Sequence, residues 1–81
     1  MNSQIKIIPN PNDGRFNLLR ENSFNSLCRI YNLFGELVLE ETVMRNSNSF
    51  DLDLPSGIYF LRLENGIELK PISIKFIVLK P

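Results

Sequence analysis

The chain has 81 residues, and its nine basic and nine acidic side chains cancel to no net charge. This length suits one domain with a modest core, which leaves little room for a deep substrate pocket. With no histidine and a single cysteine, the composition excludes histidine-dependent general-base chemistry, internal disulfides and cysteine-rich zinc sites. The balanced charge gives no indication of a nucleic-acid partner or an anionic membrane.

The composition favours β structure, because the strongest helix former, alanine, is absent and isoleucine, phenylalanine and asparagine are common. No apolar run approaches the roughly 20 residues of a membrane span. The first eight residues lack the charged and apolar regions of a signal peptide. We therefore expect any export address to lie upstream of this sequence.

The first part of the chain predicts three short strands. They cover residues 4–8, residues 15–19, where Phe16 and Leu18 share a face, and residues 27–32, where Cys28 and Ile30 share a face. A turn over residues 9–14 follows the first strand, since its prolines fix the backbone and it ends in Asp-Gly. Residues 20–26 are expected to form a loop, and residues 32–35 a second turn.

Residues 36–45 are the only helix candidate. The period-two recurrence of Leu37, Leu39 and Val43, and the lack of a capping residue before it, favour a strand instead. A polar turn is predicted at Asn46, Ser47 and Asn48. It leads into a strand over residues 49–54, with Phe50, Leu52 and Leu54 pointing inward, and then into a turn over residues 55–57.

The last third of the chain predicts a hairpin and a closing strand. Residues 58–64 read as an apolar strand, and Asn65-Gly66 is a type I′ turn signal that leads back through residues 67–69. Pro71 indicates a sheet edge or a bulge before the closing strand over residues 72–79. About seven strands at regular spacing predict an all-β sandwich in a single domain.

Few side chains are candidates for chemistry. Asp51 and Asp53 are a possible carboxylate pair, but their spacing on one strand favours two solubilising charges on its outer face. Asn10, Asn12 and Asp13 resemble part of a calcium loop, yet the full ligand pattern is absent and an ordinary turn is favoured. We expect no catalytic, metal or cofactor site.

Cys28 has no histidine to activate it, so core packing is favoured over a nucleophilic role. Tyr31 and Tyr59 could stack on sugars or peptides, but burial of each ring with a backbone partner for its hydroxyl is favoured. Lys70, Lys75 and Lys80 make the final residues purely basic. They fit an outward face guarded against edge pairing, or alternatively a docking face.

The order of several short motifs resembles a known family. The motifs are Pro9-Asn10-Pro11, Asp13-Gly14, Tyr31-Asn32 with Gly35, Phe50-Asp51-Leu52, Leu54-Pro55-Ser56-Gly57-Ile58-Tyr59, Asn65-Gly66 and Lys75-Phe76-Ile77-Val78. Together they span nearly the whole chain. They resemble the type A C-terminal sorting domain of type IX (Por) secretion cargo in Bacteroidetes.

The resemblance implies an Ig-like β-sandwich of about seven antiparallel strands, filling residues 1–81 with a core of about residues 5–80. It implies a non-catalytic sorting signal, excised from a larger secreted protein, for a cargo fused at its N-terminus. The implied partners are the outer-membrane translocon, its shuttle components and a surface sortase. The cargo would cross the periplasm and then be attached to the cell surface or released.

The resemblance also assigns recognition to three segments, in which Gly57 is expected to permit an unusual φ and the terminal strand to be read by strand addition. The assigned residues are Pro9, Asn10, Pro11, Gly57, Ile58, Tyr59, Lys75, Phe76, Ile77, Val78, Leu79 and Lys80. A monomer, or a weak dimer through an edge strand, is expected. The alternative is an Ig-like adhesion or carbohydrate-binding module, against which the absence of tryptophan argues.

Overall fold

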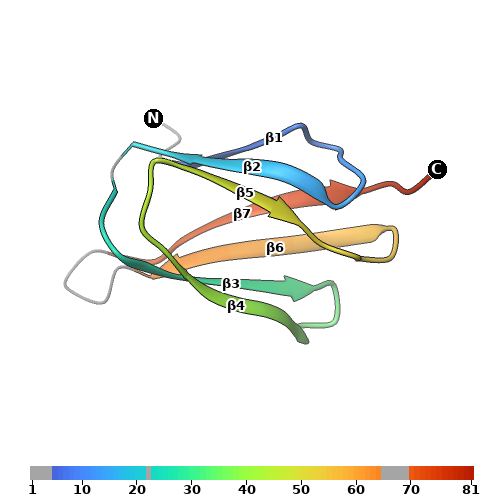
Figure 1. The fold of residues 1–81 in the computed structure, drawn as a ribbon. Helices are drawn as coiled ribbons and strands as arrows, with labels where there is room; N and C mark the ends of the chain where they lie inside the picture. The colour runs from blue at the N-terminus through green and yellow to red at the C-terminus, as the bar shows by residue number, and fades with distance from the viewer. Residues whose placement is uncertain (1–4, 22, 65–69) are drawn as a thin grey trace.

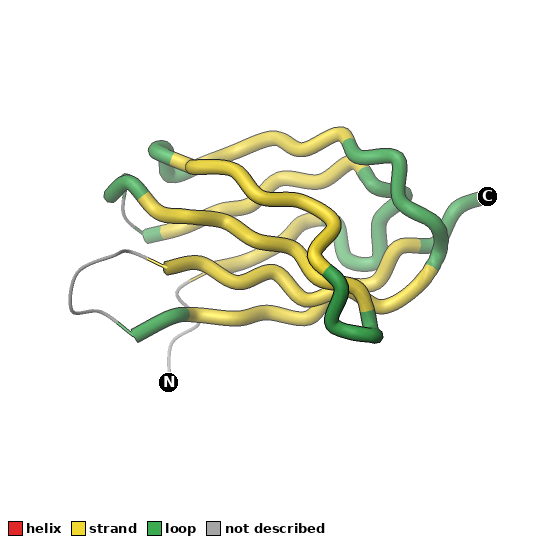
Figure 2. Tube along the Cα trace, turned by 90° about the horizontal axis from the view of Figure 1, so that it is seen from below, coloured by secondary structure: helices red, strands yellow, loops and turns green. Residues whose placement is uncertain are grey.

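The computed structural model describes residues 5–21, 23–64 and 70–81, which form two antiparallel sheets facing each other (Figure 1). Across these residues the chain consists of strands and loops, with no helix that could span a membrane (Figure 2). The strands are β1 (Ile5–Ile8), β2 (Arg15–Arg20), β3 (Ser26–Asn32), β4 (Leu37–Val43), β5 (Ser47–Asp51), β6 (Gly57–Glu64) and β7 (Ile72–Val78).

One sheet contains three strands and the other contains four. One has the order β1-β2-β5 and the other the order β4-β3-β6-β7. The predicted Ig-like sandwich of seven antiparallel strands is therefore confirmed. The strand reading of residues 36–45 is also confirmed, since this segment contains β4 and no helix.

Two boundaries differ from the prediction. Ser47 and Asn48 belong to β5, because they pair with Leu19 and Leu18 of β2, so the predicted turn at residues 46–48 is wrong in its last two positions. The same strand ends at Asp51 rather than at residue 54, because its partner β2 begins at Arg15. The Leu52 amide still donates in register to the Gly14 carbonyl, but Gly14 has a positive φ that does not belong to a strand.

The closing hairpin is described only in its strands. Asn65-Gly66 and residues 67–69 lie outside the described residues. Pro71 directly precedes β7, which is an edge strand, as the proline indicated. The register of β6 and β7 runs without a shift from Leu63 opposite Ile72 to Gly57 opposite Val78.

The core lies between the sheets and follows the predicted alternation. Phe16 and Leu18 on β2, and Cys28 and Ile30 on β3, are all buried. The remaining buried apolar residues are Ile5, Ile7, Val43, Phe50, Leu54, Tyr59, Leu61, Leu63, Phe76 and Val78. Burial raises the pKa of the Cys28 thiol to about 12, so this group is a packing residue and not a thiolate at neutral pH.

A row of four aromatic rings crosses the core from one sheet to the other. Phe50 of β5 stacks on Phe16 of β2 with ring centroids 5.1 Å apart, and Phe16 meets Phe76 of β7 at 5.0 Å. Tyr59 of β6 stacks on Phe76 at 5.6 Å. Each such pair contributes roughly 0.5–1.5 kcal/mol beyond the area it buries. The row therefore fixes how the two sheets face each other.

The burial of β4 does not follow the period of its apolar residues. Val43 is buried and Leu39 half-buried, but Leu37 is exposed although it shares their period. Among the strands, β4 packs substantially only against β3, because it is the outermost of four strands facing a sheet of three. The register also shifts between Ile30 and Tyr31, which moves Leu37 to the opposite face from Leu39.

Two glycines of the described chain have a positive φ, namely Gly14 at 105° and Gly35 at 84°. A Cβ at Gly14 would also collide with the Leu52 carbonyl oxygen, whereas a Cβ at Gly35 would meet open space. The unusual φ expected at Gly57 is wrong. Gly57 opens β6 with ordinary strand geometry, and a Cβ there would meet the Tyr59 ring at a normal 3.8 Å.

Alanine substitutions at these three glycines separate steric collision from backbone strain. We expect Gly14→Ala to lower the free energy of unfolding by about 2–4 kcal/mol and Gly35→Ala by about 1 kcal/mol. Gly57→Ala should leave it unchanged or raise it slightly, because alanine is less flexible than glycine in the unfolded chain. Urea unfolding of the three variants measures this order, and a Gly14→Ala protein as stable as the parent would contradict it.

Candidate functional site

The three segments to which the sequence assigned recognition meet at one end of the sandwich. β6 begins at Gly57 opposite Val78, where β7 ends, and Ile58 lies opposite Ile77. The turn after β1 lies beside the same end of β7, with Asn12 in a parallel bridge to Val78 (Figure 1). Residues that are far apart in the sequence therefore share one end of the fold.

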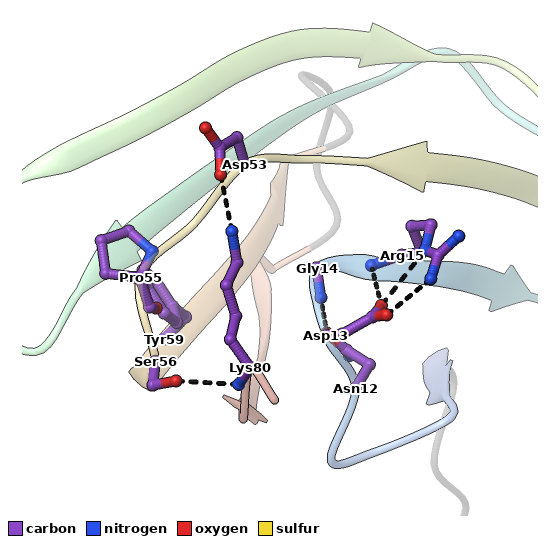
Figure 3. A network of polar contacts seen from close by, with 9 residues as sticks. All are labelled: Asn12, Asp13, Gly14, Arg15, Asp53, Pro55, Ser56, Tyr59 and Lys80. Atoms are coloured by element: carbon purple, nitrogen blue, oxygen red, sulfur yellow. Dashed lines mark hydrogen bonds and ion pairs between the residues drawn. The ribbon is translucent and has the colours of Figure 1, made fainter.

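Asn12 fastens the turn to β7. Its backbone amide donates to the Ile77 carbonyl at 3.0 Å, and its carbonyl accepts from the Leu79 amide at 2.7 Å. Its buried side chain shapes the turn itself, since it donates to the Pro9 carbonyl at 3.0 Å. It also accepts from the Gly14 amide at 2.9 Å (Figure 3). All of its polar groups are satisfied, as burial requires.

Asn10 adds a second tie to the same strand, since its side-chain oxygen accepts from the Ile77 amide at 3.0 Å. The peptide bonds before Pro9 and Pro11 are both cis. Both outward backbone groups of Ile77 are thus occupied by the turn. Strand addition at this part of β7 would have to displace the turn, so the expected reading of the terminal strand by strand addition does not fit its last residues.

The tail after β7 is held on its other side by the loop between β5 and β6. The Lys80 amide donates to the Ser56 hydroxyl at 2.8 Å, and the Lys80 ammonium pairs with Asp53 at 2.6 Å (Figure 3). In the same loop, the Tyr59 hydroxyl donates to the Pro55 carbonyl at 2.7 Å. This confirms the buried ring and backbone partner predicted for Tyr59, while Tyr31 is half-buried.

A shallow hollow of about 420 Å³ lies between the turn and the tail. Charged groups dominate its lining, which consists of Asp13, Arg15, Asp51, Leu52, Asp53, Lys80 and Pro81. Two of its three carboxylates are paired with cations, because Asp13 pairs with Arg15 at 2.7 Å and Asp53 with Lys80. In the described parts of the chain, no group of three acidic, cysteine or histidine side chains is arranged to hold a metal.

The pairing is reflected in the ionisation of both carboxyls. Hydrogen bonds from Arg15 lower the pKa of Asp13 from 3.8 to about 2, and Lys80 lowers the pKa of Asp53. Asp51 and Asp53 are both exposed, as predicted for solubilising charges. The arrangement is a set of surface ion pairs around a hollow, and the pairing favours the ionised form of Asp13 and Asp53.

The predicted recognition residues fall into three groups by exposure. Tyr59, Phe76 and Val78 are buried, so they support the end from within and cannot meet a partner. Gly57, Ile58 and Ile77 are half-buried. The exposed residues are Pro9, Asn10, Pro11, Lys75, Leu79 and Lys80. We call the exposed residues Pro9, Asn10, Pro11, Leu79 and Lys80 the turn–tail surface.

Three residues that hold the turn–tail surface in place were not among those predicted. Asn12 was read as an ordinary turn residue, Asp53 as a solubilising charge and Ser56 as part of a turn. A signal existed only for Asn12, since a further asparagine after a Pro-Asn-Pro turn is suited to local backbone capping. The contacts of Asp53 and Ser56 with Lys80 span 27 and 24 positions, which local sequence patterns do not reveal.

Comparison with known proteins identifies the family. The chain matches the secretion system C-terminal sorting domain over residues 6–79, and it belongs to that family. The match covers every strand except the first residue of β1. The predicted resemblance to a type IX secretion sorting domain is thereby confirmed.

One solved structure with the same fold comes from PorZ of Porphyromonas gingivalis, described as an essential bacterial surface component of the type-IX secretion system. The two superpose with a TM-score of 0.77 at 17% identity, over 94% of this chain and 11% of PorZ. At that identity the likeness concerns the fold, and this chain corresponds to a small part of PorZ. No curated protein matches the chain.

The Asp13 carboxyl offers a direct test of the turn geometry. A lowered pKa means that the pairing favours the folded state above pH 3.8, and that this contribution is lost as the pH falls through about 2. We expect NMR titration to give a pKa of about 2, and Arg15→Gln to return it towards 3.8. An unchanged value in the variant would contradict the assigned cause.

Asn12 and Asn10 should differ in their contribution to stability. Asn12→Ala leaves the partly buried Pro9 carbonyl and the buried Gly14 amide without their partner, which costs about 1–3 kcal/mol of unfolding free energy. Asn10→Ala removes a single exposed bond and should cost at most about 1 kcal/mol, while speeding hydrogen exchange at the Ile77 amide. Chemical denaturation and amide exchange measure the two effects, and equal costs would show that burial of Asn12 is unimportant.

Proposed function

We propose that residues 1–81 form the non-catalytic C-terminal sorting signal of a larger secreted protein. In this proposal the signal directs an N-terminally attached cargo through the type IX outer-membrane translocon. Membership of the sorting-domain family supports a sorting role. The observation that carries the proposal is the joining of the Pro9–Asn12 turn, the start of β6 and the end of β7 at one end of the sandwich.

The turn–tail surface is our candidate for the part that the translocon reads. It is held by hydrogen bonds on both sides, so little conformational entropy would be lost when a partner binds it. It presents two prolines, an amide, an apolar side chain and an ammonium group without a deep cavity. Because backbone groups there are occupied, recognition would use side chains rather than strand addition.

The later steps of the route are part of the same proposal. The cargo would cross the periplasm, be received by shuttle components at the outer membrane, and then be released or attached by a surface sortase that removes this domain. Family membership supports export to the surface or the medium in general. The buried Tyr59 and half-buried Tyr31 do not favour the alternative of a carbohydrate-binding module, since neither forms an exposed stacking platform.

A passenger assay tests the proposal. A signal peptide and a fluorescent protein are fused before residue 1, and the fusion is expressed in a Bacteroidetes host with and without a working type IX translocon. We expect fluorescence at the surface or in the medium only in the competent host. Retention in the periplasm of both hosts would contradict the sorting role.

Point variants locate the signal better than deletion of residues 75–81, because that deletion also removes the core residues Phe76 and Val78. The double variant Leu79→Ser with Lys80→Glu should reduce export at least tenfold while the purified domain stays folded. The matched control is Lys6→Glu, an exposed charge reversal on β1. Normal export of the double variant would remove the tail from the proposal, even if the parent domain is exported.

A further inference from the structure

The outer edge of β4 is an unprotected edge strand. β4 is seven residues long, contains neither lysine nor proline, and closes the four-stranded sheet on one side. Leu37 is 50% exposed and Val38 39% exposed, at the point where the register of β4 against β3 shifts. Edge strands are normally protected by charge, proline, a bulge or a covering loop, because their free backbone groups are a template for another strand. Here the register shift disturbs the start of β4, whereas residues 39–43 pair with β3 in an unbroken register and carry only the charges of two glutamates.

Exposed apolar surface continues into the turn that precedes β4. Phe34 is 85% exposed and Leu33 58% exposed, next to each other in the tight turn between β3 and β4. Asn32 holds this turn by accepting from the amides of Phe34 and Glu36, so the apolar tip is displayed by an ordered turn. Contiguous exposed apolar groups of this kind mark interaction surfaces.

The charge on β4 indicates what would cover it. Glu40 and Glu41 are adjacent, so they lie on opposite faces of the strand. Glu40 pairs with Arg29 at 2.7 Å, while Glu41 has no ion pair among the described residues. A strand added here would place two successive residues beside the two glutamates, one on each face, and further residues beside Leu37 and Leu39.

We propose that the outer edge of β4 accepts an extended strand of a partner protein that carries two adjacent basic residues next to apolar ones. The added strand would supply backbone hydrogen bonds for affinity, and its lysines or arginines would give selectivity through cross-strand charge pairing. Pairing of two β4 strands from separate copies fits less well, because four glutamates in one short ladder would repel one another. An anionic membrane also fits less well, because its headgroups would be repelled by the glutamates that lie near the exposed Leu33 and Phe34.

This inference does not rest on the sorting role, because β4 contributes no residue to the turn–tail surface. The two can therefore fail separately. Failure of export while β4 still binds the added strand would contradict the sorting proposal alone. Failure of strand binding while export is normal would contradict the β4 proposal alone.

Peptide titration of the isotope-labelled 81-residue chain tests the proposal. The probe is the acetylated, amidated heptapeptide Lys-Lys-Val-Thr-Val-Lys-Lys, whose symmetry lets it pair in either direction. We expect chemical-shift changes and slowed amide exchange along Leu37–Val43. The counterpart Glu-Glu-Val-Thr-Val-Glu-Glu should bind at least tenfold more weakly, with the difference shrinking as salt rises.

A charge reversal supplies the matched variant. Glu41→Lys breaks no ion pair of the described chain, so the fold should be retained, and the preference between the basic and acidic peptides should fall at least fivefold. Glu21→Lys, an exposed reversal just after β2 on the other sheet, should leave the preference unchanged. Phe34→Ser should weaken both peptides equally if the apolar tip contacts the added strand.

Several results would overturn the inference. These are equal binding of both peptides, shifts confined to β5 or β7, and absence of binding at millimolar peptide. Protection of β4 amides that appears with protein concentration alone would assign the edge to a second copy. Partition of the chain onto phosphatidylglycerol vesicles through Phe34, without peptide binding, would assign it to a membrane.

Discussion

The aromatic row through the core is the contact on which the rest of this small fold depends. Phe50, Phe16, Phe76 and Tyr59 come from four strands and both sheets, and each ring meets the next at 5.0–5.6 Å. A domain of this size buries a limited apolar area, so a few large side chains carry a large share of its stability. Since Tyr59 also donates to Pro55, the row extends into the loop that holds Lys80.

The end of the sandwich above this row is ordered by hydrogen bonds rather than by further apolar packing. Asn12 joins the turn both to the end of β7 and to the turn's own backbone, and Asn10 adds a second bond to β7. The buried amide makes the arrangement specific, because another turn conformation would leave its polar groups unpaired in a dry environment. The exposed prolines and the tail are thus presented on a rigid base.

The sequence alone predicted much of the fold, because apolar and polar residues alternate clearly along strands that have one buried face and one exposed face. Phe16 and Leu18, or Cys28 and Ile30, are apolar at every second position, and each is buried. The pattern in β4 gave the strand but not the exposure of Leu37, which depends on the register shift and on how many strands the opposite sheet contains. That number is a property of the whole fold, and no local pattern reports it.

The candidate site was predicted in its members but not in their arrangement. The motifs containing Pro9 and Ile77 were recognised, yet the bond from the Ile77 amide to Asn10 spans 67 positions. Gly57 shows that a family motif can also suggest a feature that the structure does not have. Its place in a family motif suggested a special φ, whereas Gly14 has the backbone and the carbonyl contact that demand glycine.

The direction of β1 has a consequence for how this domain sits on a longer chain. β1 enters the sandwich at Ile5, opposite Arg20, and runs toward the turn that meets the end of β7. The longest dimension of the domain is 38 Å, and its strands run along it (Figure 1). Anything joined ahead of β1 is consequently separated from the turn–tail surface by this four-residue strand, a length of about 13 Å. A large folded passenger would need a linker before β1 to leave the turn–tail surface accessible, because the strand alone is shorter than a typical domain.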